Sequence, residues 1–123
     1  MASPTDILIE SGTPLPEEPV ILSVTLPYGH MGGYYINGEQ KPVLTFVIGG
    51  TYIFDQSDIS NTGHPLGLSS VFESGSLEGL TFYINGSEYS RASYEYYLQN
   101  YASSFSSFEI HYTVPENASE TLY

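Results

Sequence analysis

The chain has 123 residues, of which 2 are basic and 14 acidic, so its formal net charge at pH 7 is −12. Because Lys41 and Arg91 are its only Lys and Arg residues, it has no basic stripe for phosphates or anionic lipids, and we expect neither a nucleic acid nor a membrane as partner. The absence of cysteine excludes disulfides, thiolate metal sites and thiol catalysis.

The first 19 residues are rich in proline, which disfavours a regular hydrogen-bond ladder. We therefore divide the chain into an extended arm at 1–19 and a single domain at 20–123. The arm contains one apolar run, Ile7, Leu8 and Ile9, that is long enough for a short strand. This run can pair as an edge strand of the same domain or bind a neighbouring subunit, so its three residues are interface candidates.

Beyond Pro19, apolar and polar side chains alternate, which is the period-two pattern of β-strands. Clusters of Gly, Asn, Pro and Ser separate these segments at intervals that fit a β-sandwich. The tetrapeptide Tyr-Ile-Asn-Gly occurs twice, at 35–38 and 83–86, and Asn-Gly favours the tight turn of a β-hairpin. The predicted strands are 20–26, 34–36, 44–48, 51–54, 66–72, 80–84 and 108–114.

One stretch follows a helical period instead. After Ser93, Tyr94, Tyr97, Leu98 and Tyr101 recur at helical spacing, so we expect one short helix in a long crossover. In the strand that follows, Phe108, Ile110, Tyr112 and Val114 should face the core, while Glu109, His111 and Thr113 face solvent. The sequence thus predicts a mainly β fold: a single antiparallel or mixed Greek-key sandwich with one short helix.

Polar residues concentrate directly after the strand at 51–54, in the sequence Asp-Gln-Ser-Asp-Ile-Ser-Asn-Thr-Gly-His-Pro that spans 55–65. Short polar side chains can accept hydrogen bonds from nearby backbone N–H groups in Asx and ST turns. The proline restricts the preceding histidine to an extended backbone. We therefore predict a bend that is structured by Asp55, Asp58, Ser60, Asn61, His64 and Pro65.

A family resemblance lies in the stretch from Tyr34 to Leu66. It reads Tyr-Tyr-Ile-Asn-Gly, then Pro-Val-Leu-Thr-Phe, then Gly-Thr-Tyr-Ile-Phe-Asp-Gln-Ser-Asp-Ile-Ser-Asn-Thr-Gly-His-Pro-Leu, and its most specific part is 54–66. This stretch resembles cupredoxin-like domains in structural proteins of marine and cyanobacterial phages. The resemblance implies a cupredoxin-like Greek-key sandwich and a location in the virion.

In cupredoxins, a histidine at the place of His64 is the first copper ligand, and a cysteine, a second histidine and often a methionine follow. This chain has no cysteine, and one imidazole alone is not a transition-metal site. We therefore predict no cofactor and keep His64 as a weak metal candidate. Either His64 anchors the turn through hydrogen bonds, or a longer natural chain completes a site. Of the other histidines, we expect His111 to be exposed and His30 to make a loop contact.

Twelve tyrosines are more than one small core requires. Tyrosine combines a large apolar ring with a polar tip, which suits protein interfaces and sugar-stacking sites. The alternative is that half of the tyrosines near the helix pack the crossover onto the sandwich. The interface candidates in this cluster are Tyr89, Tyr94, Tyr96, Tyr97 and Tyr101.

The sequence contains none of the common catalytic motifs, so we expect a protein that is not an enzyme. With the resemblance, this predicts a virion structural protein, a capsid decoration or cement protein that binds the major capsid protein or another virion protein. A homo-oligomer is expected, with a trimer as the leading symmetry. Two alternatives stay open: a tail or fibre adhesin that binds carbohydrate, and a copper-binding electron carrier.

Overall fold

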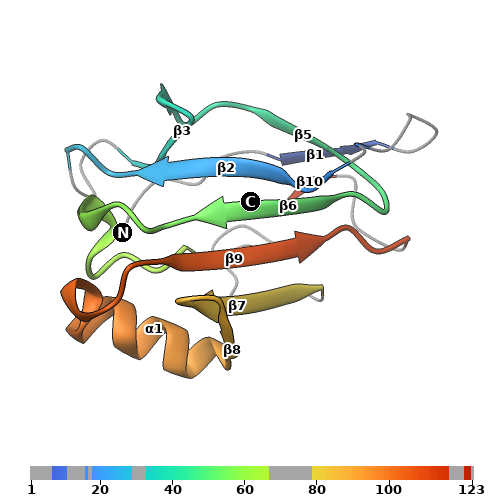
Figure 1. The fold of residues 1–123 in the computed structure, drawn as a ribbon. Helices are drawn as coiled ribbons and strands as arrows, with labels where there is room; N and C mark the ends of the chain where they lie inside the picture. Colours follow the sequence, from blue (N-terminus) through green and yellow to red (C-terminus); the bar gives the residue numbers. More distant parts are fainter. Residues whose placement is uncertain are drawn as a thin grey trace.

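The computed structural model describes residues 7–10, 16, 18–28, 33–66, 79–116 and 121–122. Over these ranges the chain is mainly β, with strands in two sheets and one α-helix at the end of the larger sheet (Figure 1). This confirms the predicted β-sandwich with one short helix. The Greek-key connection and the cupredoxin type stay predictions.

The strands, in chain order, are β1 (Ile7–Glu10), β2 (Val20–Thr25), β3 (Tyr35–Ile36), β4 (Glu39–Gln40), β5 (Leu44–Val47), β6 (Thr51–Asp55), β7 (Leu80–Ile84), β8 (Ser87–Tyr89), β9 (Phe108–Thr113) and β10 (Thr121–Leu122). The helix α1 spans Arg91–Asn100, and the 3₁₀ turns of the described residues are η2 (Ile59–Asn61) and η3 (Ala102–Ser104). Of the strand predicted at 66–72, Leu66 lies outside any strand, and the remainder falls outside the described residues.

Among the described residues, the larger sheet has seven strands in the order β4-β3-β2-β6-β9-β7-β8, and the smaller sheet has three in the order β10-β1-β5. The pairs β2–β6 and β1–β5 are parallel, whereas the other pairs are antiparallel. The sandwich is therefore mixed, because it contains both parallel and antiparallel strand pairs.

The apolar run at the start of the chain forms β1, which lies between β10 and β5. It pairs within its own chain, but as the middle strand of the smaller sheet and not as an edge strand. Ile7 is only 3% exposed and belongs to the core. The prolines that suggested an extended arm flank this run without interrupting it, so three consecutive apolar residues can still pair and bury alternate side chains.

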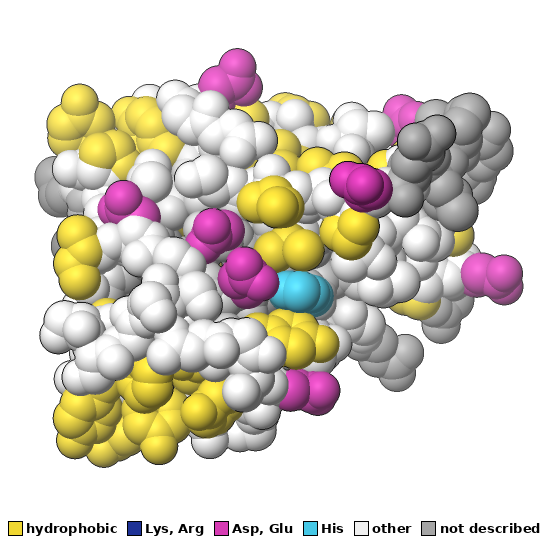
Figure 2. Space-filling view, in the orientation of Figure 1, with side chains coloured by type: hydrophobic (Ala, Val, Ile, Leu, Met, Phe, Trp, Pro, Cys, Tyr) yellow, Lys and Arg dark blue, Asp and Glu magenta, His cyan; other side chains and the backbone are white. Residues whose placement is uncertain are grey.

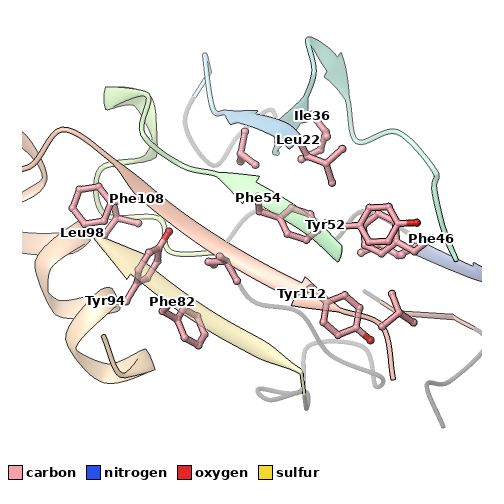
Figure 3. Close-up of a cluster of buried hydrophobic side chains, with 14 of the residues drawn as sticks. Leu22, Ile36, Phe46, Tyr52, Phe54, Phe82, Tyr94, Leu98, Phe108 and Tyr112 are labelled. Atoms are coloured by element: carbon pink, nitrogen blue, oxygen red, sulfur yellow. The ribbon is translucent and has the colours of Figure 1, made fainter. Parts of the chain in front are cut away.

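The core lies between the two sheets and against α1, and most of its side chains are the inward ones of the predicted period-two segments (Figure 3). Phe46 of β5 stacks on Tyr52 of β6, with ring centroids 3.8 Å apart and planes 9° apart, and so joins the two sheets. In β9, the predicted alternation is confirmed. The buried side chains of this strand and the residue after it are Phe108, Ile110, Tyr112 and Val114.

Both Tyr-Ile-Asn-Gly copies form the predicted hairpins. Asn37 and Gly38 connect β3 to β4, Asn85 and Gly86 connect β7 to β8, and all four have positive φ. The helix α1 begins three residues before the predicted start, because Ser90 is its N-cap.

Candidate functional site

The bend after β6 is organised around two fully buried amide side chains, Gln56 and Asn61. Gln56 Nε2 donates to Asn61 Oδ1 at 3.1 Å and to the His64 carbonyl at 2.9 Å. Asn61 Nδ2 donates to the carbonyl of Val24 at 2.7 Å and to that of Asp58 at 3.1 Å. Since buried amides are costly unless they are hydrogen-bonded, these bonds hold the bend in one conformation against β2.

Two tyrosine hydroxyls complete this network. Tyr94 of α1 donates to Gln56 Oε1 at 2.9 Å, and Tyr34 donates to the carbonyls of His64 and Pro65 at 3.2 and 3.3 Å. Burial raises the pKa of Tyr34 to about 12. Burial, followed by the charges of Asp55 and other neighbours, raises the pKa of Tyr94 well above its usual value. Both phenols therefore stay protonated at neutral pH and act as hydrogen-bond donors.

The acidic residues of the bend accept hydrogen bonds from the backbone. Asp55 Oδ1 accepts from the Ser57 amide at 2.9 Å, and Asp58 Oδ1 accepts from the Ser60 amide at 3.0 Å. The pKa of Asp58 is lowered because the Ser60 hydroxyl and amide both donate to its carboxylate. Ser60 Oγ in turn accepts from the Leu26 amide at 2.9 Å, which ties η2 to the end of β2.

His64 enters this network through its backbone. Its carbonyl accepts from Gln56 and Tyr34, and its amide donates to the Asn61 carbonyl at 2.8 Å. Within the described part of the chain, no group of three or more His, Cys, Asp or Glu side chains is placed to hold a metal ion. The hydrogen bonds make the bend a structural anchor, and they bring together all six residues predicted for it.

Sequence reasoning missed Gln56, the centre of the network. The signal was present, because Gln56 continues the inward alternation of Tyr52 and Phe54 at period two and so places a polar side chain at a core position. Such a position requires hydrogen-bond partners. Tyr34 was missed as well, since nothing local indicates that its hydroxyl reaches the carbonyls of 64 and 65.

A second cluster lies at the outer side of α1, and we call it the aromatic surface. Tyr97 is at its centre, with its ring centroid 5.3 to 6.1 Å from those of four neighbours. Tyr96 is 52% exposed and Tyr101 is 48% exposed. In Figure 2 this region is the hydrophobic patch at the lower left, over α1. The members of the aromatic surface are Tyr89, Tyr96, Tyr97, Tyr101 and Phe105.

Tyr94 does not belong to this surface, although the sequence grouped it there. It is fully buried, and its ring lies between those of Phe82 and Phe108, at 5.3 and 5.7 Å (Figure 3). The reason is helical geometry: Tyr94 and Leu98 are four residues apart and share the inward side of α1, while Tyr96 and Tyr101 turn outward. Tyr94 is therefore a core residue.

The interface candidates in β1 likewise include both buried and exposed side chains. Ile7 is buried, Ile9 is half-buried and Leu8 is 43% exposed, so of these three candidates only Leu8 presents much of its side chain to solvent. His111, predicted to be simply exposed, is half-buried. Its Nε2 lies 2.9 Å from Glu109 Oε1, and its ring centroid is 4.3 Å from that of Tyr83. The Tyr83 ring thus comes from the neighbouring strand β7, and the sequence around His111 did not indicate this contact.

Among the described residues, no helix is long and apolar enough to cross a membrane. Comparison of the chain with protein-family models, with curated proteins and with solved structures gives no match. The geometry alone gives two candidate sites, the buried anchor at 55–66 and the exposed aromatic surface on α1.

Proposed function

We propose that this chain is a non-enzymatic structural protein of a virus particle, a decoration protein on the outside of a phage capsid. The observation that carries the proposal is the aromatic surface, which presents Tyr96 and Tyr101 half-exposed on the outer side of α1. The resemblance of residues 34–66 to domains of phage structural proteins is the reason to propose a phage particle. The partner would be the major capsid protein or another virion protein.

Aromatic side chains of this kind suit a contact between proteins. Tyrosine loses little conformational entropy on binding, and its ring and hydroxyl together provide apolar area and a hydrogen bond. Here the rings also hold one another, since Tyr96 lies 5.5 Å from Tyr97 and 5.8 Å from Tyr101 between centroids. A surface that is ordered before binding keeps more of its interaction energy as affinity.

The helix is in turn fixed to the sandwich. Ser90 caps its first turn, and Tyr94 and Leu98 bury its inner side. The hydrogen bond from Tyr94 to Gln56 ties it to the bend. The bend therefore contributes to the proposed function as support for the aromatic surface.

The test is association with particles. Antibodies raised against the purified chain are applied to intact, concentrated particles of marine cyanobacterial phages, and bound antibody is located by electron microscopy. Labelling of the capsid exterior supports the proposal, whereas labelling of tails alone, or of soluble cell protein alone, contradicts it. Specific binding of the isolated chain to a glycan array would favour the carbohydrate adhesin instead.

The aromatic surface is tested by substitution. The double variant Tyr96→Ala and Tyr101→Ala should weaken rebinding to labelled particles by about tenfold or more, since exposed aromatic residues at interfaces dominate affinity. Tyr28→Ala is the matched control, because Tyr28 is 67% exposed and contacts Tyr35, outside the aromatic surface. Equal loss in both variants would contradict the role assigned to this surface.

A further inference from the structure

The side of the seven-stranded sheet that faces away from the core carries two rows of side chains in register. Figure 2 views this side, which we call the open sheet face. The first row consists of Ile21, Ile53, His111 and Thr81, from β2, β6, β9 and β7. The second row consists of Ser23, Asp55, Glu109, Tyr83 and Glu88, from β2, β6, β9, β7 and β8.

The centre of the open sheet face is apolar. Ile21 is 62% exposed, and the register places it beside the half-buried Ile53. Tyr83 adds its ring, which lies against that of His111 at 4.3 Å. A single exposed aliphatic residue needs no explanation. Here Ile21, Ile53 and Tyr83 together give this face an apolar area that a partner can cover.

The charge of the face is negative. Asp55, Glu109 and Glu88 follow one another along the second row, apart from the intervening Tyr83. The two basic side chains of the sequence lie elsewhere: Lys41 lies against Gly33, and the guanidinium of Arg91 lies over the Phe82 ring at 5.6 Å. Figure 2 accordingly shows no Lys or Arg among the described side chains on this face.

Glu109 already contacts His111 Nε2 at 2.9 Å on this face, and positive charge that complements the other carboxylates would come from a partner. A second copy of the chain is unsuitable, because both copies would present carboxylates on a protein of charge −12. A sheet face on which the adjacent Ile21 and Ile53 lie beside a row with three carboxylates matches an amphipathic helix whose aliphatic stripe is bordered by Lys or Arg. The aliphatic stripe would cover Ile21 and Ile53, and the basic border would reach the second row.

We infer that the open sheet face is a docking surface for a basic amphipathic helix of a protein partner. This inference does not rest on the proposed function, because the aromatic surface shares no residue with the open sheet face. It adds a second contact surface of a different chemical character, one that is acidic and built on strands.

The test uses three synthetic helical peptides and nuclear magnetic resonance titration of the full chain. The first peptide has a Leu stripe bordered by Lys, the second replaces Lys by Glu, and the third replaces Leu by Ser. The first should bind saturably and shift the signals of Ile21, Ile53, Tyr83 and His111. The other two should bind at least about tenfold more weakly, since each lacks one of the two complementary features.

Variants locate the contact without disturbing the core. Ile21→Ser and Glu88→Lys should each weaken binding of the first peptide by about fivefold or more. Val43→Ser and Glu39→Lys are matched controls, because Val43 is 63% exposed, Glu39 is exposed on β4, and neither belongs to the two rows. Controls should change affinity by less than about twofold.

Three outcomes would overturn the inference: no saturable binding of the first peptide, equal binding of the Ser-substituted peptide, or self-association of the chain through Ile21 in sedimentation experiments. Each can occur while the chain still binds particles through the aromatic surface. Conversely, the variant with Tyr96→Ala and Tyr101→Ala can lose particle binding while it still binds the first peptide. The two proposals can therefore fail separately.

Discussion

Tyr94 and Tyr112 are both fully buried tyrosines, and they differ in what their hydroxyls contact. The Tyr94 hydroxyl donates to Gln56 Oε1, whereas the Tyr112 hydroxyl has no hydrogen-bond partner among the described residues. A buried donor without a partner costs free energy that an apolar replacement avoids. The two hydroxyl groups thus make opposite contributions to stability, although both side chains are fully buried.

We expect Tyr112→Phe to leave the free energy of unfolding unchanged or raise it by about 1 kcal/mol, since it removes an unpaired polar group. Tyr94→Phe should lower the free energy of unfolding by about 1 kcal/mol, because the buried Gln56 oxygen loses a donor. Urea unfolding monitored by circular dichroism measures both. A greater loss in Tyr112→Phe than in Tyr94→Phe would show that the Tyr112 hydroxyl is satisfied.

The hydrogen-bonded Asp58 carboxylate should make the free energy of unfolding depend on pH in the acidic range. Hydrogen bonds from Ser60 lower its pKa in the folded protein, so its contribution is present above the unfolded pKa, about 3.9. That contribution is lost as the pH falls through the folded pKa. The stability difference between the protein and Asp58→Asn, which keeps an acceptor oxygen but no charge, should therefore shrink between about pH 5 and pH 2. Because Asp58 is exposed, the effect should be small; a difference that stays constant over this interval would contradict it.

At the scale of elements, the two Asn-Gly turns do more than reverse the chain. The Asn37 amide donates to the Ser23 carbonyl, and Asn37 Oδ1 accepts from the Ser23 amide. Asn85 exchanges the same two bonds with Ser107 and also accepts from the Ser106 amide and hydroxyl. Each turn thus clamps a segment that is distant in sequence. The repeated tetrapeptide has the same structural role twice.

Two substitutions of Asn85 separate the cost of losing its hydrogen bonds from the cost of its positive φ. Asn85→Gly keeps easy access to positive φ but loses three accepted hydrogen bonds, so it should lower the free energy of unfolding by about 1 to 2 kcal/mol. Asn85→Ala should cost about 1 kcal/mol more, because alanine tolerates φ of 51° poorly. Asn37→Gly is the matched control and should cost less, since it loses one accepted bond. Equal losses in the two glycine variants, measured by urea unfolding, would contradict the clamp.

At the scale of the whole molecule, the buried phenols connect the bend, the helix and the sheet, and they make stability sensitive to alkali. Tyr34 has a folded pKa of about 12, above its unfolded value of about 10. A raised pKa contributes stability that is fully present below the unfolded value and is lost as the pH rises through the folded one. Burial also raises the pKa of Tyr94, which adds to the same dependence.

We therefore expect the free energy of unfolding to fall steadily between about pH 10 and pH 12. Tyr34→Phe should show a shallower fall over the same interval, because it lacks one of the shifted phenols. Tyr28→Phe is the control, since Tyr28 is largely exposed and should leave the slope unchanged. Thermal unfolding monitored at several pH values measures the slope, and equal slopes for all three proteins would exclude this role of Tyr34.

Local pattern by itself determined the mainly β class, the hairpin turns and the inward side of β9. These follow from period-two alternation and from Asn-Gly chemistry, which act between residues close in the sequence. Helical spacing likewise indicated α1, although the helix begins earlier than predicted, at Arg91, with Ser90 as its N-cap. The bend at 55–65 was visible because short polar side chains bond to nearby amides.

Only the tertiary structure decided which segments are neighbours. It placed β1 between β5 and β10, put Tyr94 inside and Tyr96 outside, and set His111 beside Tyr83. It also brought Gln56 to the centre of a network that spans Val24 to Tyr94. These outcomes depend on register and packing between residues that are distant along the chain, which the period of a single segment does not encode.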